Sequence, residues 1–218
     1  MNQEALQELA QQLRQPHGTH GIEVADMMNE NNIQMTLHAI ACLDIQASDV
    51  ILELGHGNCK HLPIIFQQND DISYYGLDIS TLMHQEAQKI NHDYIISNKA
   101  FFHLYEGVYI PFANNYFNKI FTVNTIYFWS QPETLLMELY RVTKPGGVLN
   151  ITYAQEDFMK QLPFTQYGFT LYSNEKVQQL VATTPFSIID FNTQRETVHT
   201  KTGEEVTRDF TTCILKKL

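Results

Sequence analysis

The residues best suited to chemistry lie in the segment 50–61, where an apolar run ends at a pair of glycines. Val50–Leu54 is followed by Gly55 and Gly57, and a polar stretch continues to His61. Glycine permits a sharp turn and brings backbone N–H groups close to a ligand, with no side chain in the way. The pattern predicts a strand, a glycine turn and a helix. Such a turn either binds a ligand or joins the two elements without one.

Asp78 supplies the second signal, because it ends the next apolar run about 20 residues after the glycines. A carboxylate at that spacing accepts hydrogen bonds from both ribose hydroxyls of an adenosine ligand. It can also cap the helix that follows, and the two roles are compatible. Gly55, Gly57 and Asp78 together predict an adenosine site at the ends of two strands.

The type of adenosine ligand follows from charge and from the composition of the turn. A dinucleotide fingerprint needs a third glycine, and Lys60 stands at that position; the Gly-Lys-Ser/Thr sequence of a nucleoside triphosphate site does not follow either. Glu53, just before Gly55, repels phosphate but tolerates the ammonium and sulfonium groups of S-adenosylmethionine. The residues therefore favour a cationic adenosine ligand.

The elements that must position these residues are predicted from apolar periodicity and turn signals. Seven strands are expected at Val50–Leu54, Ser73–Asp78, within Ala100–Glu106, Lys119–Val123, Val148–Tyr153, and around Phe186–Asn192 and Val206–Leu215. Helices are expected at 2–14, about Ile22–Leu43 (with a break that could fall at 29–32), His61–Gln68, Leu82–Asn91, Glu133–Val142 and Asn174–Ala182. Alternating strands and helices predict an α/β fold with a doubly wound, mostly parallel seven-stranded sheet. The last two strands, joined by a polar turn holding Gly203, form an antiparallel edge hairpin.

The chain is expected to form one domain over residues 1–218. Its first part, residues 1–45, is expected to be a helical cap or lid on a core of residues 46–218. The stretch Gln15–Gly21 is predicted to be a loop from its Pro and Gly content. His17 and His20 within it would either close over a ligand or lie on the surface.

Composition limits the class of partner. The 218 residues hold 24 acidic and 14 basic side chains, and the formal charge of −10 argues against nucleic acid as the main partner. No apolar run reaches the roughly 18 residues that a membrane span needs, and the polar start predicts no signal peptide. The three scattered cysteines indicate a cytoplasmic protein without a disulfide framework. The nine histidines form no HxxxH or HxH array, so no metal site is expected.

Several ordered motifs resemble those of the class I S-adenosylmethionine-dependent methyltransferases, in the broad small-molecule group. Glu53–Asn58 is similar to the first motif, E-x-G-x-G-x-G, with Cys59 at its last glycine, and Asp78 matches the acid of the second motif. A later stretch resembles L-P-F…F-D-x-I, with Asn118 in place of the Asp, and Arg141–Gly147 is close to R-V-L-K-P-G-G. Sheets of this family also end in an antiparallel edge hairpin.

A narrower resemblance, to a bacterial, type 11-like subgroup of this family, rests on three segments. These are Leu13–Gly18, the residues Met27-Met28-Asn29 with Asn32, and Asn124–Trp129, which reads Asn-Thr-Ile-Tyr-Phe-Trp. The resemblance implies S-adenosylmethionine as cofactor and in-line transfer of its methyl group to a small-molecule acceptor. In-line transfer depends first on positioning, so no catalytic base is named.

The resemblance also implies which residues form the site. The cofactor-binding residues would be Glu53, Gly55, His56, Gly57, Asp78, Ile79, Glu106, Gly107 and Asn124. Candidates for the acceptor pocket are His17, His20, Tyr127, Phe128 and Trp129, for which packing or surface exposure is the alternative interpretation.

Other functions remain open at this level. The departures at Cys59 and Asn118 leave room for a non-catalytic, regulatory protein that binds S-adenosylmethionine or S-adenosylhomocysteine. A nicotinamide dehydrogenase is disfavoured by Lys60 and by the edge hairpin. An RNA or protein methyltransferase is disfavoured by the acidity of the chain and by the lack of an Asn-Pro-Pro-Tyr type of sequence.

Overall fold

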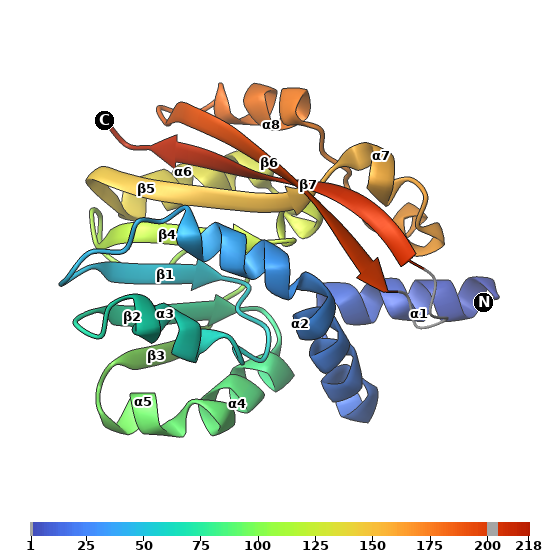
Figure 1. Ribbon diagram of the computed structural model, residues 1–218, viewed down its shortest axis with the longest axis horizontal. Helices are drawn as coiled ribbons and strands as arrows, with labels where there is room; N and C mark the ends of the chain where they lie inside the picture. Colours follow the sequence, from blue (N-terminus) through green and yellow to red (C-terminus); the bar gives the residue numbers. More distant parts are fainter. Residues whose placement is uncertain (1, 200–204) are drawn as a thin grey trace.

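The computed structural model describes residues 2–199 and 205–218, and a seven-stranded sheet runs through them (Figure 1). Its strand order is β3-β2-β1-β4-β5-β7-β6. The strands are β1 (Val50–Leu54), β2 (Ser73–Asp78), β3 (Ala100–Leu104), β4 (Phe117–Val123), β5 (Thr143–Ala154), β6 (Ser187–His199) and β7 (Glu205–Lys216). The prediction of a seven-stranded α/β sheet is confirmed.

Strand direction follows from the connections. β1 to β5 pair in parallel, and β7 runs antiparallel between β5 and β6. The expected antiparallel edge is therefore confirmed. The chain order reverses at β1, which has β2 on one side and β4 on the other, and its Leu54 aligns with Leu77 of β2. Open α/β sheets bind ligands at the carboxyl end of such a reversal point.

The α-helices are α1 (Gln3–Arg14), α2 (Gly18–Ala41), α3 (Leu62–Gln68), α4 (Thr81–Ile90), α5 (His92–Ile96), α6 (Pro132–Val142), α7 (Glu156–Met159) and α8 (Asn174–Val181). Two short 3₁₀ turns, η1 (Ile126–Phe128) and η2 (Pro163–Gln166), complete the set. None of these described helices is long and apolar enough to cross a membrane.

Helices cover both faces of the sheet, which is why the central strands are apolar on both sides. Along β1, Ile51 packs in a cluster that includes residues of α2, α3 and α4, whereas Leu52 and Leu54 pack in a second cluster with residues of α6 and α8. All three side chains are fully buried. This burial fixes β1, so the turn after it starts from a rigid strand.

The N-terminal part departs from the prediction. The loop prediction for Gln15–Gly21 is wrong in its second half, because α2 begins at Gly18. The break near residues 29–32 does not occur either. Arg208 of β7 donates to Asn32 Oδ1 (3.2 Å) and to the Asn31 carbonyl, and Met35 is fully buried one turn later. Tertiary contacts thus override the weak helix propensity of the asparagines.

The other differences are smaller. The five-residue helix α5 was not predicted, and β5 and β6 are longer than expected because they continue along their partner strands. The predicted turn at Gly203 lies outside the described residues.

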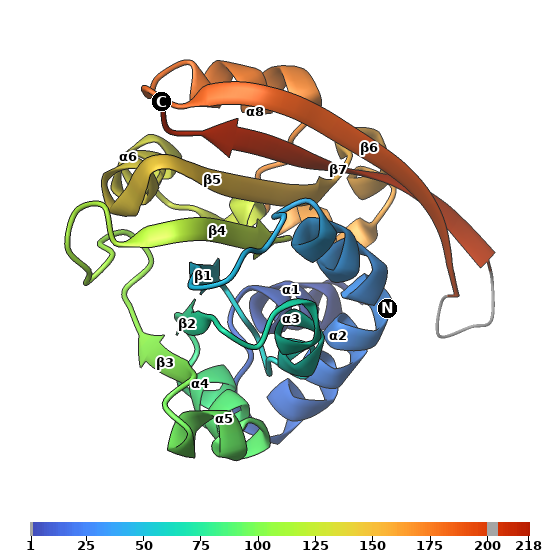
Figure 2. The same cartoon turned by 60° about the vertical axis from the view of Figure 1, so that its left-hand side comes forward.

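We call α1, α2 and the loop between them the roof, because they lie across the carboxyl ends of β1 and β2 (Figures 1 and 2). The loop is fixed to the sheet by two hydrogen bonds: Gln15 Nε2 donates to the Ile79 carbonyl (2.9 Å), and Ser80 Oγ donates to the Pro16 carbonyl (2.6 Å). Farther along, Asn58 Nδ2 donates to Asp26 Oδ1 of α2 (2.9 Å). The roof is thereby held over the ends of the strands.

Candidate functional site

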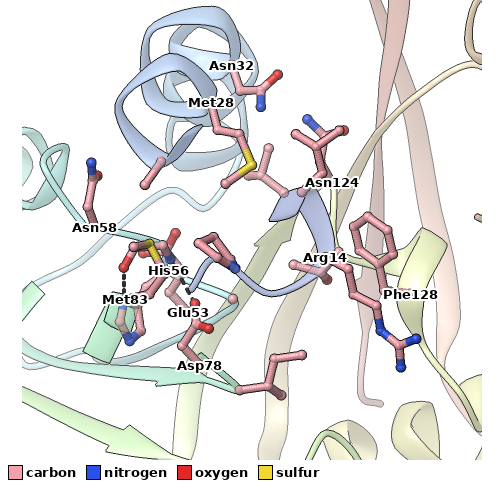
Figure 3. A pocket seen from close by; sticks show the side chains of 18 of the residues that line it. Arg14, Met28, Asn32, Glu53, His56, Asn58, Asp78, Met83, Asn124 and Phe128 are labelled. Carbon is pink, nitrogen blue, oxygen red and sulfur yellow. Dashed lines mark hydrogen bonds between the residues drawn. The ribbon is translucent and has the colours of Figure 1, made fainter. Parts of the chain in front are cut away.

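A cavity lies between the roof and the carboxyl ends of the strands (Figure 3). We call the segments 53–61, 78–83 and 105–107 its floor and the segment 123–129 its β4 side. The lining residues are Leu13, Arg14, Pro16, Ala25, Met28, Asn29, Asn32, Thr36, Glu53, Gly55, His56, Gly57, Asn58, His61, Asp78, Ile79, Met83, Tyr105, Gly107, Val123, Asn124, Thr125, Phe128 and Trp129.

The glycine turn between β1 and α3 exposes backbone to this cavity. Gly55 and Gly57 have φ angles of +76° and +57°, in the region that favours glycine. A Cβ on Gly55 would lie 2.3 Å from Thr125 Cγ2, so the close approach of the β4 side requires glycine there. A Cβ on Gly57 would meet nothing within 4 Å, so the backbone of Gly57 borders open space. A ligand can therefore come close to the backbone of Gly57, whose N–H donates to Asp78 and whose carbonyl oxygen lies 2.7 Å from His56 Nδ1.

Asp78 lies at the end of β2 and is 6% exposed. Its Oδ2 accepts from the Gly57 N–H (3.0 Å) and its Oδ1 accepts from the Ser80 N–H (2.8 Å). Burial raises the pKa of the Asp78 carboxyl, although His56 and the two N–H groups oppose that rise. Each carboxylate oxygen retains a lone pair after these bonds, so Asp78 can still accept from a ligand.

Glu53 is buried and belongs to a hydrogen-bond network beneath the turn. Its Oε2 accepts from His61 Nε2 (2.8 Å) and from the Tyr74 hydroxyl, which also lies 3.2 Å from Cys59 Sγ. No described residue donates to Oε1, and Glu53 lines the cavity. One oxygen of Glu53 is therefore fixed by the protein, and the other is available to a ligand.

Cys59, the departure from the family glycine, is fully buried with a φ of +51°. The ligating atoms of Glu53, Cys59 and His61 all lie within 4.8 Å of one another, which is the spacing of a metal site. Tyr74 joins Glu53 to Cys59 through its hydroxyl, so hydrogen bonds account for the cluster without an ion. Asn118, the other departure, is structural: its Oδ1 accepts from the Val50 N–H (3.0 Å) and from Lys144 Nζ (2.9 Å).

At the far end of the floor, Ile79, Gly107 and Tyr105 line the cavity. Glu106, predicted to bind adenine, is exposed and is not among the lining residues. Tyr105 takes its place, and burial raises the pKa of its phenol well above the usual range. An aromatic ring beside Ile79 provides a flat apolar surface for a base.

On the β4 side, Asn124 and Trp129 line the cavity, whereas Tyr127 does not. Tyr127 is 3% exposed, and its hydroxyl donates to Asn124 Oδ1 (2.9 Å) and accepts from the Ala154 N–H (2.6 Å). It positions Asn124 from behind. Trp129 Nε1 donates to Thr125 Oγ1 (3.1 Å), and the neighbouring Phe128 also faces the cavity.

The three histidines named as site candidates do not lie together. His56 lines the cavity and is 3% exposed, with Nδ1 2.7 Å from the Gly57 carbonyl oxygen. His17 and His20 do not line it. The Nδ1 atom of His17 lies 3.1 Å from the carbonyl oxygen of Gln15. His20 is an exposed residue of α2, and its Nδ1 atom lies 3.5 Å from Glu23 Oε2. The structure thus places neither predicted lid histidine at the cavity.

Sequence reasoning assigned no site role to the lining residues of the roof. One face of α2 contributes Ala25, Met28, Asn29, Asn32 and Thr36, and the end of α1 and the following loop contribute Leu13, Arg14 and Pro16. The α2 residues recur every three or four positions, as one face of a helix does. That spacing is present in the sequence, but the possible helix break at 29–32 argued against one continuous helical face. Asn58, His61, Met83, Tyr105, Val123 and Thr125 were also missed, whereas Phe128 lines the cavity as predicted.

Comparison with known proteins agrees with this geometry. A family model described as a methyltransferase domain matches residues 52–151. An uncharacterized methyltransferase of Bacillus subtilis, YdaC, is 26% identical over 128 residues, which cover 58% of this chain and 67% of that protein. The malonyl-[acyl-carrier protein] O-methyltransferase of a Marinomonas species is 25% identical over 150 residues, 66% of this chain and 51% of that protein.

Among solved structures, the fold is similar to a chain in the complex between the Trm112 methyltransferase activator of Haloferax volcanii and a methyltransferase. The TM-score is 0.72 at 16% identity, covering 88% of this chain and 92% of that chain. The strand order with its antiparallel edge, the motifs along residues 53–147 and the methyltransferase relatives all agree. Residues 52–151 thus match a methyltransferase domain, and the chain has the fold of the class I S-adenosylmethionine-dependent methyltransferases.

Proposed function

We propose that this protein transfers the methyl group of S-adenosylmethionine to a small-molecule acceptor by in-line displacement. One observation carries the proposal: the buried carboxylate of Asp78 is hydrogen-bonded to the Gly57 N–H at the edge of a cavity beside the glycine turn. Both oxygens of that carboxylate can accept from ribose hydroxyls. This is the arrangement that an adenosine cofactor needs.

The residues present fit the cofactor along its whole length. Asp78 would hold the ribose, Ile79 and Tyr105 would pack on the adenine, and the open backbone at Gly57 would border the methionine half. The free oxygen of Glu53 would meet the ammonium group, and Asn124 would line the same end. When bound, the cofactor supplies a methyl group on a positively charged sulfur. The protein contributes orientation and exclusion of water.

The position of the roof over the cavity favours a small acceptor over a large one. Residues 1–45 would act as a cap on the core 46–218, because the loop after α1 and the first half of α2 close the cavity from above. The formal charge of −10 disfavours the phosphate backbone of a nucleic acid. The Marinomonas relative is an O-methyltransferase, which agrees with a small or carrier-bound acceptor.

The two departures from the family motifs do not favour a non-catalytic role. Cys59 and Asn118 both lie outside the cavity lining, and each has a structural role in its network. A regulatory binder with a weakened cofactor site therefore has no specific support.

Calorimetry with S-adenosylhomocysteine tests the proposal. We expect saturable one-to-one binding by the unaltered protein, and about 10- to 100-fold weaker binding by Asp78→Ala, because charge-assisted hydrogen bonds to the ribose are lost. Asp93→Ala serves as the matched control, since Asp93 is fully exposed on α5. Absence of binding at high micromolar concentrations, with the protein folded, would overturn the proposal.

A further inference from the structure

The floor of the cavity differs from its other walls in the titratable side chains that it carries. All titratable lining residues other than Arg14 lie on the floor: Glu53, His56, His61, Asp78 and Tyr105. The described lining residues of the roof and the β4 side include no Asp, Glu, His, Cys, Lys or Tyr. The walls that face an acceptor thus hold no side chain able to remove a proton from it.

Arg14 is the one Lys or Arg side chain among the described lining residues, and it lies at the end of α1. Arg14 is exposed, and its guanidinium has no hydrogen-bond or ion-pair partner among the residues that the structure describes. In Figure 3 it lies toward Phe128 and Asn124, away from Asn58 and His56. The unpaired positive charge therefore lies at the exposed edge of the cavity, toward its β4 side rather than its floor.

The charges of the floor do not balance Arg14. Asp78 is turned toward Gly57 and Ser80, and Glu53 is fixed by His61 and Tyr74. Glu53 is matched to the ammonium of the cofactor and Asp78 to its ribose, so the carboxylate of the cofactor is the one cofactor group that could compete for Arg14. An exposed guanidinium at the edge of a cavity can pair with an anionic ligand that enters it, and carboxylates are its best geometric match.

We propose that the methyl acceptor is a small carboxylate, that Arg14 is its counterion, and that the product is a methyl ester. This inference rests on the proposed function. A carboxylate is ionised at neutral pH, so it needs no base, which agrees with the walls around it. One carboxylate oxygen forms a bond to the methyl carbon, the bond from that carbon to sulfur breaks, and the electron pair stays on sulfur. The cofactor becomes a neutral thioether and no proton moves.

The neighbouring walls suit such an acceptor. Leu13, Met28 and Phe128 offer apolar surface for its body, and Asn29 has no hydrogen-bond partner among the described residues. Asn32 Oδ1 already accepts from Arg208, so its Nδ2 is left to donate. These two side chains can thus donate hydrogen bonds, as an anion requires.

The test uses methyl-labelled S-adenosylmethionine with the small-molecule fraction of a bacterial lysate and with a panel of carboxylic acids, including phenylacetate, benzoate and octanoate, each paired with its amide. Methyl esters release volatile methanol in mild base, whereas N-methyl and ether products do not. We expect base-labile label. We also expect the carboxylates of the panel to raise the melting temperature of the complex between the protein and S-adenosylhomocysteine, and the matching amides not to raise it.

Arg14→Gln should lower kcat/KM for the labelled acceptor by about 10- to 100-fold, the loss expected for a charged hydrogen-bond pair, and leave affinity for S-adenosylhomocysteine within about threefold. Arg14→Lys should recover part of the rate. Arg195→Gln, an exposed arginine of the edge hairpin, is the matched control.

Three results would overturn the inference while leaving the proposed function intact. These are base-stable label, a loss of S-adenosylhomocysteine affinity in Arg14→Gln as large as the loss of rate, and neither transfer nor carboxylate-specific stabilisation in a protein that binds S-adenosylhomocysteine. Failure to bind S-adenosylhomocysteine would instead remove the proposed function itself.

Discussion

The floor and the roof of the cavity are built by different means. The floor follows from rigid strand ends: β1 is buried on both faces, and its turn is tied to β2 by the hydrogen bond from Gly57 to Asp78. The roof is a pair of helices held by side-chain contacts from distant segments, such as Ser80 to the Pro16 carbonyl and Arg208 to α2. Local sequence determines the first, and tertiary contacts determine the second.

This difference parallels the two halves of the proposed reaction. The floor carries the acids and the glycine turn that suit a shared cofactor, and the roof carries the arginine and asparagines that would choose an acceptor. If the assignment is correct, changes in the floor should abolish cofactor binding, whereas changes that loosen the roof should spare it.

The largest effect is expected in the floor, for Gly55→Val. The new Cβ would lie 2.3 Å from Thr125 Cγ2 at a φ of +76°. Overpacking and the left-handed backbone should together cost about 3 kcal/mol in the free energy of unfolding, and binding of S-adenosylhomocysteine should be lost. Gly146→Ala is the control, because Gly146 has φ +78° with nothing within 4 Å of its Cβ position. Equal destabilisation in the two variants, measured by urea denaturation, would show that packing at Gly55 is not the cause.

The second effect concerns the roof and the edge hairpin. Arg208 and Glu196 form a pair whose side chains are 9% and 11% exposed, and Arg208 also holds α2. Arg208→Gln leaves Glu196 without its partner and should cost about 3 kcal/mol in the free energy of unfolding. Affinity for S-adenosylhomocysteine should fall less than threefold, because the floor is untouched.

Arg195→Gln is the comparison on the same hairpin: the ion pair of Arg195 with Asp209 is exposed to solvent, so its loss should change the free energy of unfolding far less. Denaturation curves and calorimetry measure both variants. A cofactor affinity in Arg208→Gln that falls as far as in Asp78→Ala would contradict the division between floor and roof.

The smallest effect is a pH dependence of the floor. Burial raises the pKa of Asp78 in the folded protein, so without ligand its protonated form persists to higher pH than in an unfolded chain. The stability that this group contributes is therefore present at low pH and is lost as pH rises through the raised pKa. Ribose hydroxyls donate to the ionised form, so cofactor affinity should have the opposite dependence and fall on acidification.

Calorimetric titrations of S-adenosylhomocysteine across the acid range check this sign. Below the raised pKa, the affinity of the unaltered protein should fall up to about tenfold per pH unit. Asp78→Asn should bind more weakly at neutral pH and show a flatter profile. An affinity of the unaltered protein that rises on acidification would contradict the role of the Asp78 carboxylate.

The sequence predicted the floor more fully than the roof for a physical reason. Gly55, Gly57 and Asp78 follow from short-range rules of strand, turn and spacing, and the structure brings all three to one cavity. Glu106 and Tyr127 could not be placed, because the direction of a side chain after a strand depends on its packing. Exposure puts Glu106 in solvent, and two hydrogen bonds keep Tyr127 behind Asn124.

The roof was harder to predict because its determinants lie far away in the sequence. The residues around Asn31 favour a break by themselves, and the contact that keeps them helical comes from Arg208. His20 was expected in a loop and instead lies on the exposed face of α2, away from the cavity. Hydrogen bonds across the fold decide these positions.

A crystal structure of the protein with S-adenosylhomocysteine would show directly whether Asp78 holds the cofactor. We expect electron density for the ligand beneath the roof, with both ribose hydroxyls within hydrogen-bond distance of the Asp78 carboxylate and with Arg14 free of the ligand's own carboxylate. Ligand density away from Asp78, or a ribose held by other residues, would rule out this role of Asp78.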